Sequence, residues 1–270
     1  MEATNPVTEL LERRCSTRSY APTPITADER AVILHAAMRA PTAGNLMLYS
    51  IVEVDDPGLK ARLAETCDDQ PFIARAPLVL VFVADLQKWV DLFGAVGAGR
   101  LDEPAPSAAP VPGTAPGRGA AAGKRSPGPG DFVLACCDAL IAAQNAVVAA
   151  ESLGIGSCYI GDIVERGETH AELLALPRYT FPVTMLCFGR PKGGPHRTER
   201  YERHVVHRDA YRRLTPAELE QAARDLDELH GTRPGGAPGA FVRDVYRRKF
   251  TADFSAEADR SVAWWLDRWR

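Results

Sequence analysis

The run DFVLACCDALIAAQNAVVAAESL, from Asp131 to Leu153, decides how this chain folds. Its polar residues fall on one narrow stripe, and the rest of its surface is apolar and rich in alanine. A helix that is apolar nearly all round is buried, and small side chains let a neighbouring helix approach closely. At 1.5 Å per residue the helix would be about 35 Å long, and Gly154 supplies a C-terminal cap. The run therefore predicts a central helix that either crosses the domain core or forms a subunit interface.

Shorter patterns on both sides of this run predict the elements that pack against it. Leu78–Ala84, LVLVFVA, has no polar alternation, which predicts a strand covered on both faces. Thr26 with Glu29, and Thr215 with Glu218, are capping boxes that each predict the start of a helix. The remaining patterns predict strands at 49–54, 155–160 and 181–188, and helices at 6–13, 27–39, 57–67, 169–176, 215–230 and 256–270.

Two segments differ from this pattern. Between 103 and 130, proline, glycine and alanine supply 20 of the 28 residues, so the segment cannot bury enough apolar area to offset its ordering entropy. Because each flank would be a poor domain by itself, we predict one domain over 1–270 with a disordered insertion at 103–130. Residues 215–270 are predicted to form a helical extension. Its last helix carries three tryptophans, which we expect to pack on the chain's own core or on a partner subunit.

The composition is that of a soluble globular protein, with 46% hydrophobic residues, 25% charged residues and a net charge of -3. It gives no case for binding nucleic acid or a membrane, and no uninterrupted apolar run approaches the roughly 18 residues that span a bilayer. Six cysteines without CxxC spacing and no apolar signal core predict a cytoplasmic protein with reduced thiols. Cys136 and Cys137 are adjacent on the central helix, which is expected to be buried, and we expect their side chains to serve packing. His204 and His207 stand beside arginines and are not expected to bind a metal.

A chemical signal lies near the N-terminus, in Arg14-Cys15-Ser16-Thr17-Arg18. If this stretch is extended, Arg14, Ser16 and Arg18 point the same way. Two guanidinium groups that flank a hydroxyl suit a dianionic phosphate; the alternative is a solvated basic turn after a short helix. Residues 190–213 add a local positive patch, with eight Arg and Lys against three acids. The sequence contains no Walker loop, HExxH, GxSxG or dinucleotide-binding fingerprint.

Four stretches, in this order, resemble the FMN-dependent nitroreductase family, and within it the branch of NADPH-flavin oxidoreductases. They are RCSTRSY (14–20), RAPTAGNLMLYSI (39–51), DALIAAQNAVVAAESLGIGSCYIGD (138–162) and FGRP followed by HRTERY…VVH…Y (188–211). The resemblance implies an α+β fold with a central mixed or antiparallel sheet flanked by helices. It also implies a homodimer, with the long central helix at the interface and FMN bound there.

The resemblance assigns cofactor contacts residue by residue. The residues expected at the phosphate and the ribityl chain are Arg14, Ser16, Arg18, Arg197 and Arg200, with Cys15 beside them as a bystander. Thr42 and Asn45 would contact the flavin held by the partner subunit. Gln70 would reach the flavin ring or the ribityl chain.

The resemblance also implies that backbone groups hydrogen-bond the isoalloxazine edge near N5. The residues expected there are Tyr159, Ile160, Gly161 and Asp162. The chain departs from the family where many members read Asn-x-Gln-Pro, because Met47-Leu48 replaces Gln-Pro and no contact through that glutamine carries over. The insertion at 103–130 falls where family members carry the helices that roof the active site, so substrate range does not carry over either.

The implied activity is hydride transfer from NADPH or NADH, through flavin N5, to a small electron acceptor such as a nitroaromatic, a quinone or free flavin. The flavin carries this chemistry, so no side chain is required as an acid or a base. Two alternatives stay open: an FMN-dependent biosynthetic dehydrogenase that passes electrons to oxygen, and a non-enzymatic flavin- or anion-binding regulator that uses the 190–213 patch on nucleic acid. The patch lacks the interleaved aromatic residues of a base-stacking surface. The choice between NADH and NADPH, and the acceptor, are open at this stage.

Overall fold

The computed structural model describes residues 5–98, 126–194, 199–231 and 238–269. A four-stranded antiparallel sheet in the order β1-β2-β4-β3 lies at its centre. Its strands are β1 (Tyr49–Glu53), β2 (Leu78–Asp85), β3 (Gly156–Ile160) and β4 (Thr180–Gly189). Each strand begins and ends within one residue of its predicted bounds. The resemblance implied a mixed or an antiparallel sheet, and the sheet is antiparallel.

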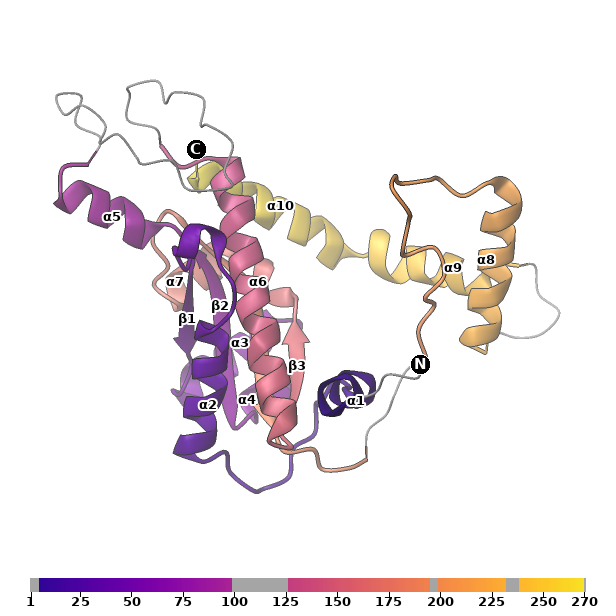
Figure 1. The fold of residues 1–270 in the computed structure, drawn as a ribbon, viewed down its shortest axis with the longest axis horizontal. Helices are drawn as coiled ribbons and strands as arrows, with labels where there is room; N and C mark the ends of the chain where they lie inside the picture. The colour runs from indigo at the N-terminus through magenta and orange to yellow at the C-terminus, as the bar shows by residue number, and fades with distance from the viewer. Residues whose placement is uncertain (1–4, 99–125, 195–198, 232–237, 270) are drawn as a thin grey trace.

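The central helix α6 (Pro129–Ser152) runs along one face of the sheet, beside α2 (Ala27–Met38) (Figure 1). Ala139, Ala142, Ala143, Ala146 and Ala150 are buried against β2, β4 and α2. By length and composition alone, α6 is the one helix in the described ranges that could cross a membrane. Its alanine-rich face packs in the core beside the sheet, which is one of the two predicted positions. The side of α6 that faces away from the sheet exposes Val133, Leu134, Leu140 and Ile141.

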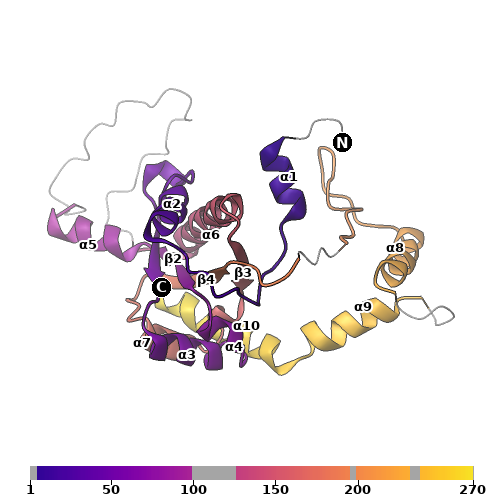
Figure 2. The same ribbon diagram turned by 90° about the horizontal axis from the view of Figure 1, so that it is seen from below.

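The opposite face of the sheet is covered by α3 (Pro57–Thr66), α4 (Pro71–Ala74), α7 (Gly167–Leu173) and α10 (Asp253–Arg268) (Figure 2). All residues of β2 are buried, as its sequence predicts. Alternate side chains of β2 serve the two cores, with Val79, Val81 and Val83 on the α3 side and Leu78, Leu80 and Phe82 on the α6 side.

The C-terminal helix α10 docks on the chain's own core through its tryptophans. Trp265 and Trp269 are fully buried, and the Trp269 ring meets the Phe132 ring edge-on at 5.2 Å between centroids. A Cβ on Gly167 would lie 2.7 Å from Trp265 Nε1, so this close approach requires glycine. Of the two predicted environments for the tryptophans, the structure therefore shows the chain's own core.

Between the sheet and α10 the chain makes a long excursion, and its described residues 199–231 and 238–250 are called the arm. Helix α8 (Pro216–Leu229) begins at the predicted capping box. Helix α9 (Ala240–Val245) continues into a π-helical turn at Tyr246–Phe250, and the sequence pattern predicts neither. Figures 1 and 2 show α8 and α9 projecting away from the sheet, whereas α10 returns to it. Exposed apolar side chains of the arm include Val205, Val206, Tyr211 and Phe250.

Several sequence-based boundaries are wrong. Helix α6 begins at Pro129, inside the predicted insertion, because the Asp131 carboxylate accepts a hydrogen bond from Gly128 N at 2.9 Å; residues 99–125 lie outside the described residues. Helix α7 begins earlier than 169, because Gly167 N donates to Ser261 Oγ of α10 at 2.9 Å. Helix α4 was not expected. Helices α1 (Pro6–Arg13) and α2 match their predicted starts, and α5 (Gln87–Ala95) follows β2.

The predicted packing of the adjacent cysteines is confirmed for Cys136, which packs against the core, and is wrong for Cys137. Cys136 is half-buried and Cys137 is exposed, so the second thiol lies outside the core of this chain. All six cysteines are free thiols. Among the described residues, no group of three His, Cys, Asp or Glu side chains is arranged to hold a metal ion.

Candidate cofactor-binding site

The stretch 14–18 follows α1 and runs extended along the free edge of β3. Thr17 N donates a hydrogen bond to Ser157 O at 2.9 Å, and Ser16 pairs with Ser157 in a parallel bridge. The Thr17 side chain is buried. A Cβ on Gly156 would lie 2.2 Å from Thr17 Oγ1, so the stretch approaches β3 this closely only because residue 156 is glycine.

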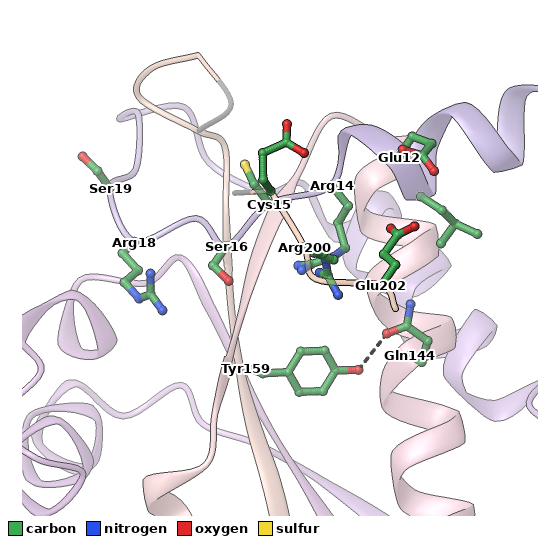
Figure 3. A pocket seen from close by; sticks show the side chains of 12 residues that line it. Glu12, Arg14, Cys15, Ser16, Arg18, Ser19, Gln144, Tyr159, Arg200 and Glu202 are labelled. Atoms are coloured by element: carbon green, nitrogen blue, oxygen red, sulfur yellow. Dashed lines mark hydrogen bonds between the residues drawn. The ribbon is translucent and has the colours of Figure 1, made fainter. Parts of the chain in front are cut away.

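A pocket of about 1240 Å³ lies over this stretch (Figure 3). Arg14, Ser16 and Arg18 all line it, but Cys15 and Ser19 line it as well, so the lining does not follow a strict alternation. Arg200 enters the same pocket from the arm. The structure therefore brings together the predicted cationic residues that it describes, and Arg197 lies outside the described residues. The remaining lining residues are Leu11, Glu12, Gln144, Tyr159, Glu199 and Glu202.

The guanidinium groups of Arg14 and Arg200 point into the same part of the pocket (Figure 3). Arg14 Nη1 is buried and has no hydrogen-bond partner among the described residues, although three glutamates line the pocket. A buried donor without a partner costs about 1–3 kcal/mol, and more when it is charged. An anion with several acceptor oxygens would satisfy this nitrogen, so the donor set fits a phosphate.

Tyr159 forms the floor of the pocket in Figure 3, where its hydroxyl donates to Gln144 Oε1 of α6 at 3.1 Å. Burial raises the pKa of Tyr159 to about 12, so the phenol stays protonated at neutral pH. The side chain of Ile160 is buried in the core. Gly161 is exposed, with open space where a Cβ would stand. These two residues can therefore offer a ligand little beyond their backbone groups. Neither lines the pocket, and their contact with a flavin stays a prediction.

Gln70 and Asp162, far apart in the sequence, form a direct pair. Gln70 Nε2 donates to Asp162 Oδ2 at 2.7 Å and to Cys67 O at 2.8 Å. Neither Gln70 nor Asp162 lines the pocket. Phe72, two residues after Gln70, has its ring centroid 6.0 Å from the guanidinium of Arg18, which does line it. The sequence predicts both residues as cofactor contacts, but not that they bind each other.

Thr42 and Asn45 lie in the turn 42–48, which does not line the pocket of its own chain. The turn is fixed by the buried carboxylate of Asp138 on α6, which accepts hydrogen bonds from the Thr42 hydroxyl, from Ala43 N at 3.0 Å and from Leu48 N at 3.1 Å. The Thr42 hydroxyl is thus already engaged within the chain. Asn45 is exposed in a left-handed conformation, with φ of 58°.

Asp138 is the structural residue that sequence reasoning missed. In the sequence it is one member of the polar stripe of the central helix. A carboxylate in the middle of an alanine-rich, largely buried helix is costly unless it is hydrogen-bonded. That mismatch was the available signal, but the turn that supplies the donors could not be identified from the sequence.

The fold and this pocket together define a class of protein. Residues 11–190 match the sequence profile of the nitroreductase family, and the chain belongs to that family. The resemblance seen in the sequence is therefore confirmed.

Characterised relatives match over most of the chain. The oxygen-insensitive NADPH nitroreductase of Salmonella typhimurium is 28% identical over 230 residues, which cover 85% of this chain and 84% of that protein. The NADPH-flavin oxidoreductase of Vibrio harveyi is 26% identical over 234 residues, which cover 85% of this chain and 84% of that protein.

Solved structures share the fold. The NADPH:FMN oxidoreductase of Vibrio harveyi in complex with NAD+ superposes with a TM-score of 0.75 at 22% identity, and the match covers 97% of this chain and 98% of that chain. NfrA2 of B. megaterium superposes with a TM-score of 0.72 at 25% identity, over 96% and 98% of the two chains. The predicted nitroreductase-like α+β fold is confirmed.

Proposed function

We propose that this protein is an FMN-dependent oxidoreductase that takes a hydride from NADPH or NADH and passes it to a small acceptor such as a nitroaromatic, a quinone or free flavin. Membership of the nitroreductase family supports the reaction class. The Salmonella and Vibrio relatives are named as an NADPH nitroreductase and an NADPH-flavin oxidoreductase, and these names support the reductant and the kind of acceptor.

The unpaired Nη1 of Arg14 is the observation that carries the proposal. It lies in a pocket that Arg18 and Arg200 also line. Each guanidinium can donate two parallel, charge-assisted hydrogen bonds to a phosphate. Arg14 and Arg200 would hold the FMN phosphate, and Ser16 and Arg18 would hold the neighbouring ribityl chain. No nicotinamide-binding fold is needed if the nucleotide and the acceptor use the same open face in turn.

Bound FMN supplies the hydride chemistry at its own N5, so the protein's task is binding and orientation. Tyr159 gives the pocket a neutral floor, and the backbone at 159–162 is open at Gly161 for close approach of a planar ring. Gln70 offers an amide two residues before Phe72, whose ring the Arg18 guanidinium approaches. None of these groups is required to move a proton.

We also propose that the working unit is a homodimer. Helix α6 exposes an apolar strip, and α1 beside it exposes Val7 and Leu11. The arm, which projects from the sheet, exposes further large apolar side chains. Apolar area on this scale marks an interaction surface, and a second copy would bring its own turn 42–48 to the pocket. Light scattering should give the mass of a dimer, and a monomer at micromolar concentration would contradict this part of the proposal.

Flavin titration and anaerobic reduction test the activity. Apoprotein should take up FMN, and NADPH or NADH should then bleach the visible flavin absorption without oxygen. An acceptor such as a quinone should restore it. Protein that does not take up FMN contradicts the proposal. Protein that binds FMN but is bleached by neither nucleotide would point instead to the biosynthetic dehydrogenase.

A further inference from the structure

A second pocket, of about 730 Å³, lies against the same N-terminal stretch as the cofactor pocket. Arg13, Glu151 and Lys192 line the second pocket only, whereas Arg14 and Arg200 line the first pocket only. The two pockets therefore have separate ends and a common wall. The residues of that wall are Cys15, Ser16, Arg18 and Ser19.

One side of the second pocket is cationic. Arg13, at the end of α1, and Lys192, after β4, are exposed and make no ion pair among the described residues. Gly193 and Gly194 follow Lys192, and open space surrounds the position that a Cβ would take on each. An anion in the pocket therefore finds two cations that are not engaged elsewhere, beside backbone that no side chain covers.

Glu151 gives the pocket a carboxylate that lacks a hydrogen-bond donor. It lies in the last turn of α6, where the helix carbonyls already carry partial negative charge. Its Oε1 is buried and accepts no hydrogen bond from the described residues. Burial raises the pKa of the Glu151 carboxyl, and the charges of Arg14 and Arg13 oppose the rise. A ligand in the pocket can supply the donor that the chain does not.

This combination of groups selects among anions. The cations favour any oxyanion, but the carboxylate repels an anion that has no proton to share. An oxyanion that keeps a proton satisfies both, because its charged oxygens accept from Arg13 and Lys192 while its O–H donates to Glu151. Such O–H···O⁻ hydrogen bonds are short and about twice as strong as those between neutral groups.

Inorganic phosphate is the common oxyanion with this property. It keeps at least one proton throughout the neutral range, whereas sulfate keeps none and a phosphate monoester loses its last proton with a pKa of about 6. We propose that the second pocket is a binding site for inorganic phosphate, held by Arg13 and Lys192 and recognised through its O–H by Glu151. Phosphate binding here does not require FMN to bind in the first pocket.

The proton between Glu151 and the anion makes the selectivity depend on pH. Sulfate can be accepted only if Glu151 takes up a proton from water, which becomes harder as the pH rises. The preference for phosphate over sulfate should therefore grow between pH 6 and 8, by about tenfold per pH unit at most. The charged and titratable groups around Glu151 in the described structure are Arg13 and Arg14 beside it, Arg18, Lys192 and the Cys15 thiol on the pocket wall, and Arg190 near Gly154, which is paired with Glu29.

Calorimetric titration with inorganic phosphate and with sulfate, at constant ionic strength, tests the site. FMN-loaded protein is used, because bound FMN fills the first pocket. Phosphate should bind at millimolar concentrations, and sulfate should bind about tenfold more weakly at pH 8, because it lacks the hydrogen bond to a charged group. Arg13→Ala and Lys192→Ala should each weaken phosphate binding severalfold.

Glu151→Gln tests the carboxylate. The amide offers an N–H donor as well as an acceptor, so this variant should bind sulfate and phosphate alike and lose the pH dependence of the selectivity. Glu172→Gln is the matched control, because Glu172 is an exposed glutamate of α7 that lines neither pocket. It should keep the wild-type preference for phosphate.

Failure of this site and failure of the proposed function give different results. Protein that takes up no FMN contradicts the proposed function, and the titration is then run on apoprotein with Arg14→Ala and Arg200→Ala, which lacks those cations of the first pocket. Absence of phosphate binding, or phosphate binding that Arg13→Ala and Lys192→Ala leave unchanged, would overturn the site. Equal affinity of the wild type for phosphate and sulfate at pH 8 would overturn the recognition by Glu151.

Discussion

Replacing Arg14 by alanine should have opposite effects on the empty and the loaded protein. In the empty pocket, Arg14 Nη1 is buried without a hydrogen-bond partner in the described structure. Removing it relieves an unsatisfied donor, whose cost is about 1–3 kcal/mol. We therefore expect apoprotein with Arg14→Ala to unfold at the same temperature as the wild type or higher.

With FMN bound, the same guanidinium would make charge-assisted hydrogen bonds to the phosphate, worth about 1.5–3 kcal/mol. Since 1.4 kcal/mol is a factor of ten in affinity, Arg14→Ala should weaken FMN binding by about 10- to 100-fold. Arg200→Ala should act in the same direction. The affinity for riboflavin, which lacks the phosphate, should change little in either variant.

The assay is quenching of flavin fluorescence by apoprotein, run with FMN and with riboflavin, alongside thermal unfolding of the apoprotein. Arg62→Ala is the matched control, because Arg62 is an exposed arginine of α3 whose ion pair is with Glu65. It should leave both flavin affinities unchanged. Equal losses of FMN and riboflavin affinity in Arg14→Ala would refute the phosphate assignment, and so would an unchanged FMN affinity.

Three further changes test other parts of the structure. Gly156→Ala should displace the 14–18 stretch, because the new Cβ would lie 2.2 Å from the buried hydroxyl of Thr17. We expect the free energy of unfolding, measured by chemical denaturation, to fall by about 1–3 kcal/mol, and FMN binding to weaken. Gly161→Ala is the control and should keep the wild-type stability, because a Cβ there meets open space. Asp138→Asn should cost about 1–3 kcal/mol, because an amide cannot accept all the hydrogen bonds from the turn, and unchanged stability would contradict that role. Burial raises the pKa of Glu165 from 4.5 to about 7 in the folded protein. Between pH 4.5 and pH 7 the folded state therefore binds more protons than the unfolded state. The part of the folding stability that comes from the protonated carboxyl should fall as pH rises from about 5 to 8. Glu165→Gln should remove that part of the decline, and parallel stability curves for the variant and the wild type would contradict it.

Local patterns in the sequence were enough to place most helices and strands. The capping boxes at Thr26 and Thr215 mark the starts of α2 and α8, because the donors and acceptors of a helix N-terminus lie within one turn of each other. The unbroken apolar run of β2 predicted burial on both faces, and both cores use it. The stretch 14–18 was correctly singled out as a cationic one, since Arg14, Ser16 and Arg18 line one pocket, but Cys15 lines it too, which alternation does not predict.

Contacts between distant segments were decided by the tertiary structure. The start of α7 depends on Ser261 of α10, and the docking of that helix depends on the absence of a Cβ at Gly167. No local pattern around residue 167 predicts its contact with Trp265, almost a hundred positions later in the sequence. For the same reason, the sequence could not decide whether the tryptophans of the last helix pack on the chain's own core or on a partner subunit.

The candidate site divides in the same way. The sequence by itself determined the chemistry available, namely arginines, a hydroxyl, an amide and a glycine at a strand end, because residue type and alternation are local properties. Only the tertiary structure decided that Arg14 Nη1 is buried without a partner among the described residues, that Asp138 holds the turn 42–48, and that Gln70 pairs with Asp162. Those features depend on burial and on pairings across the fold, and such pairings are fixed by how the helices pack on the sheet.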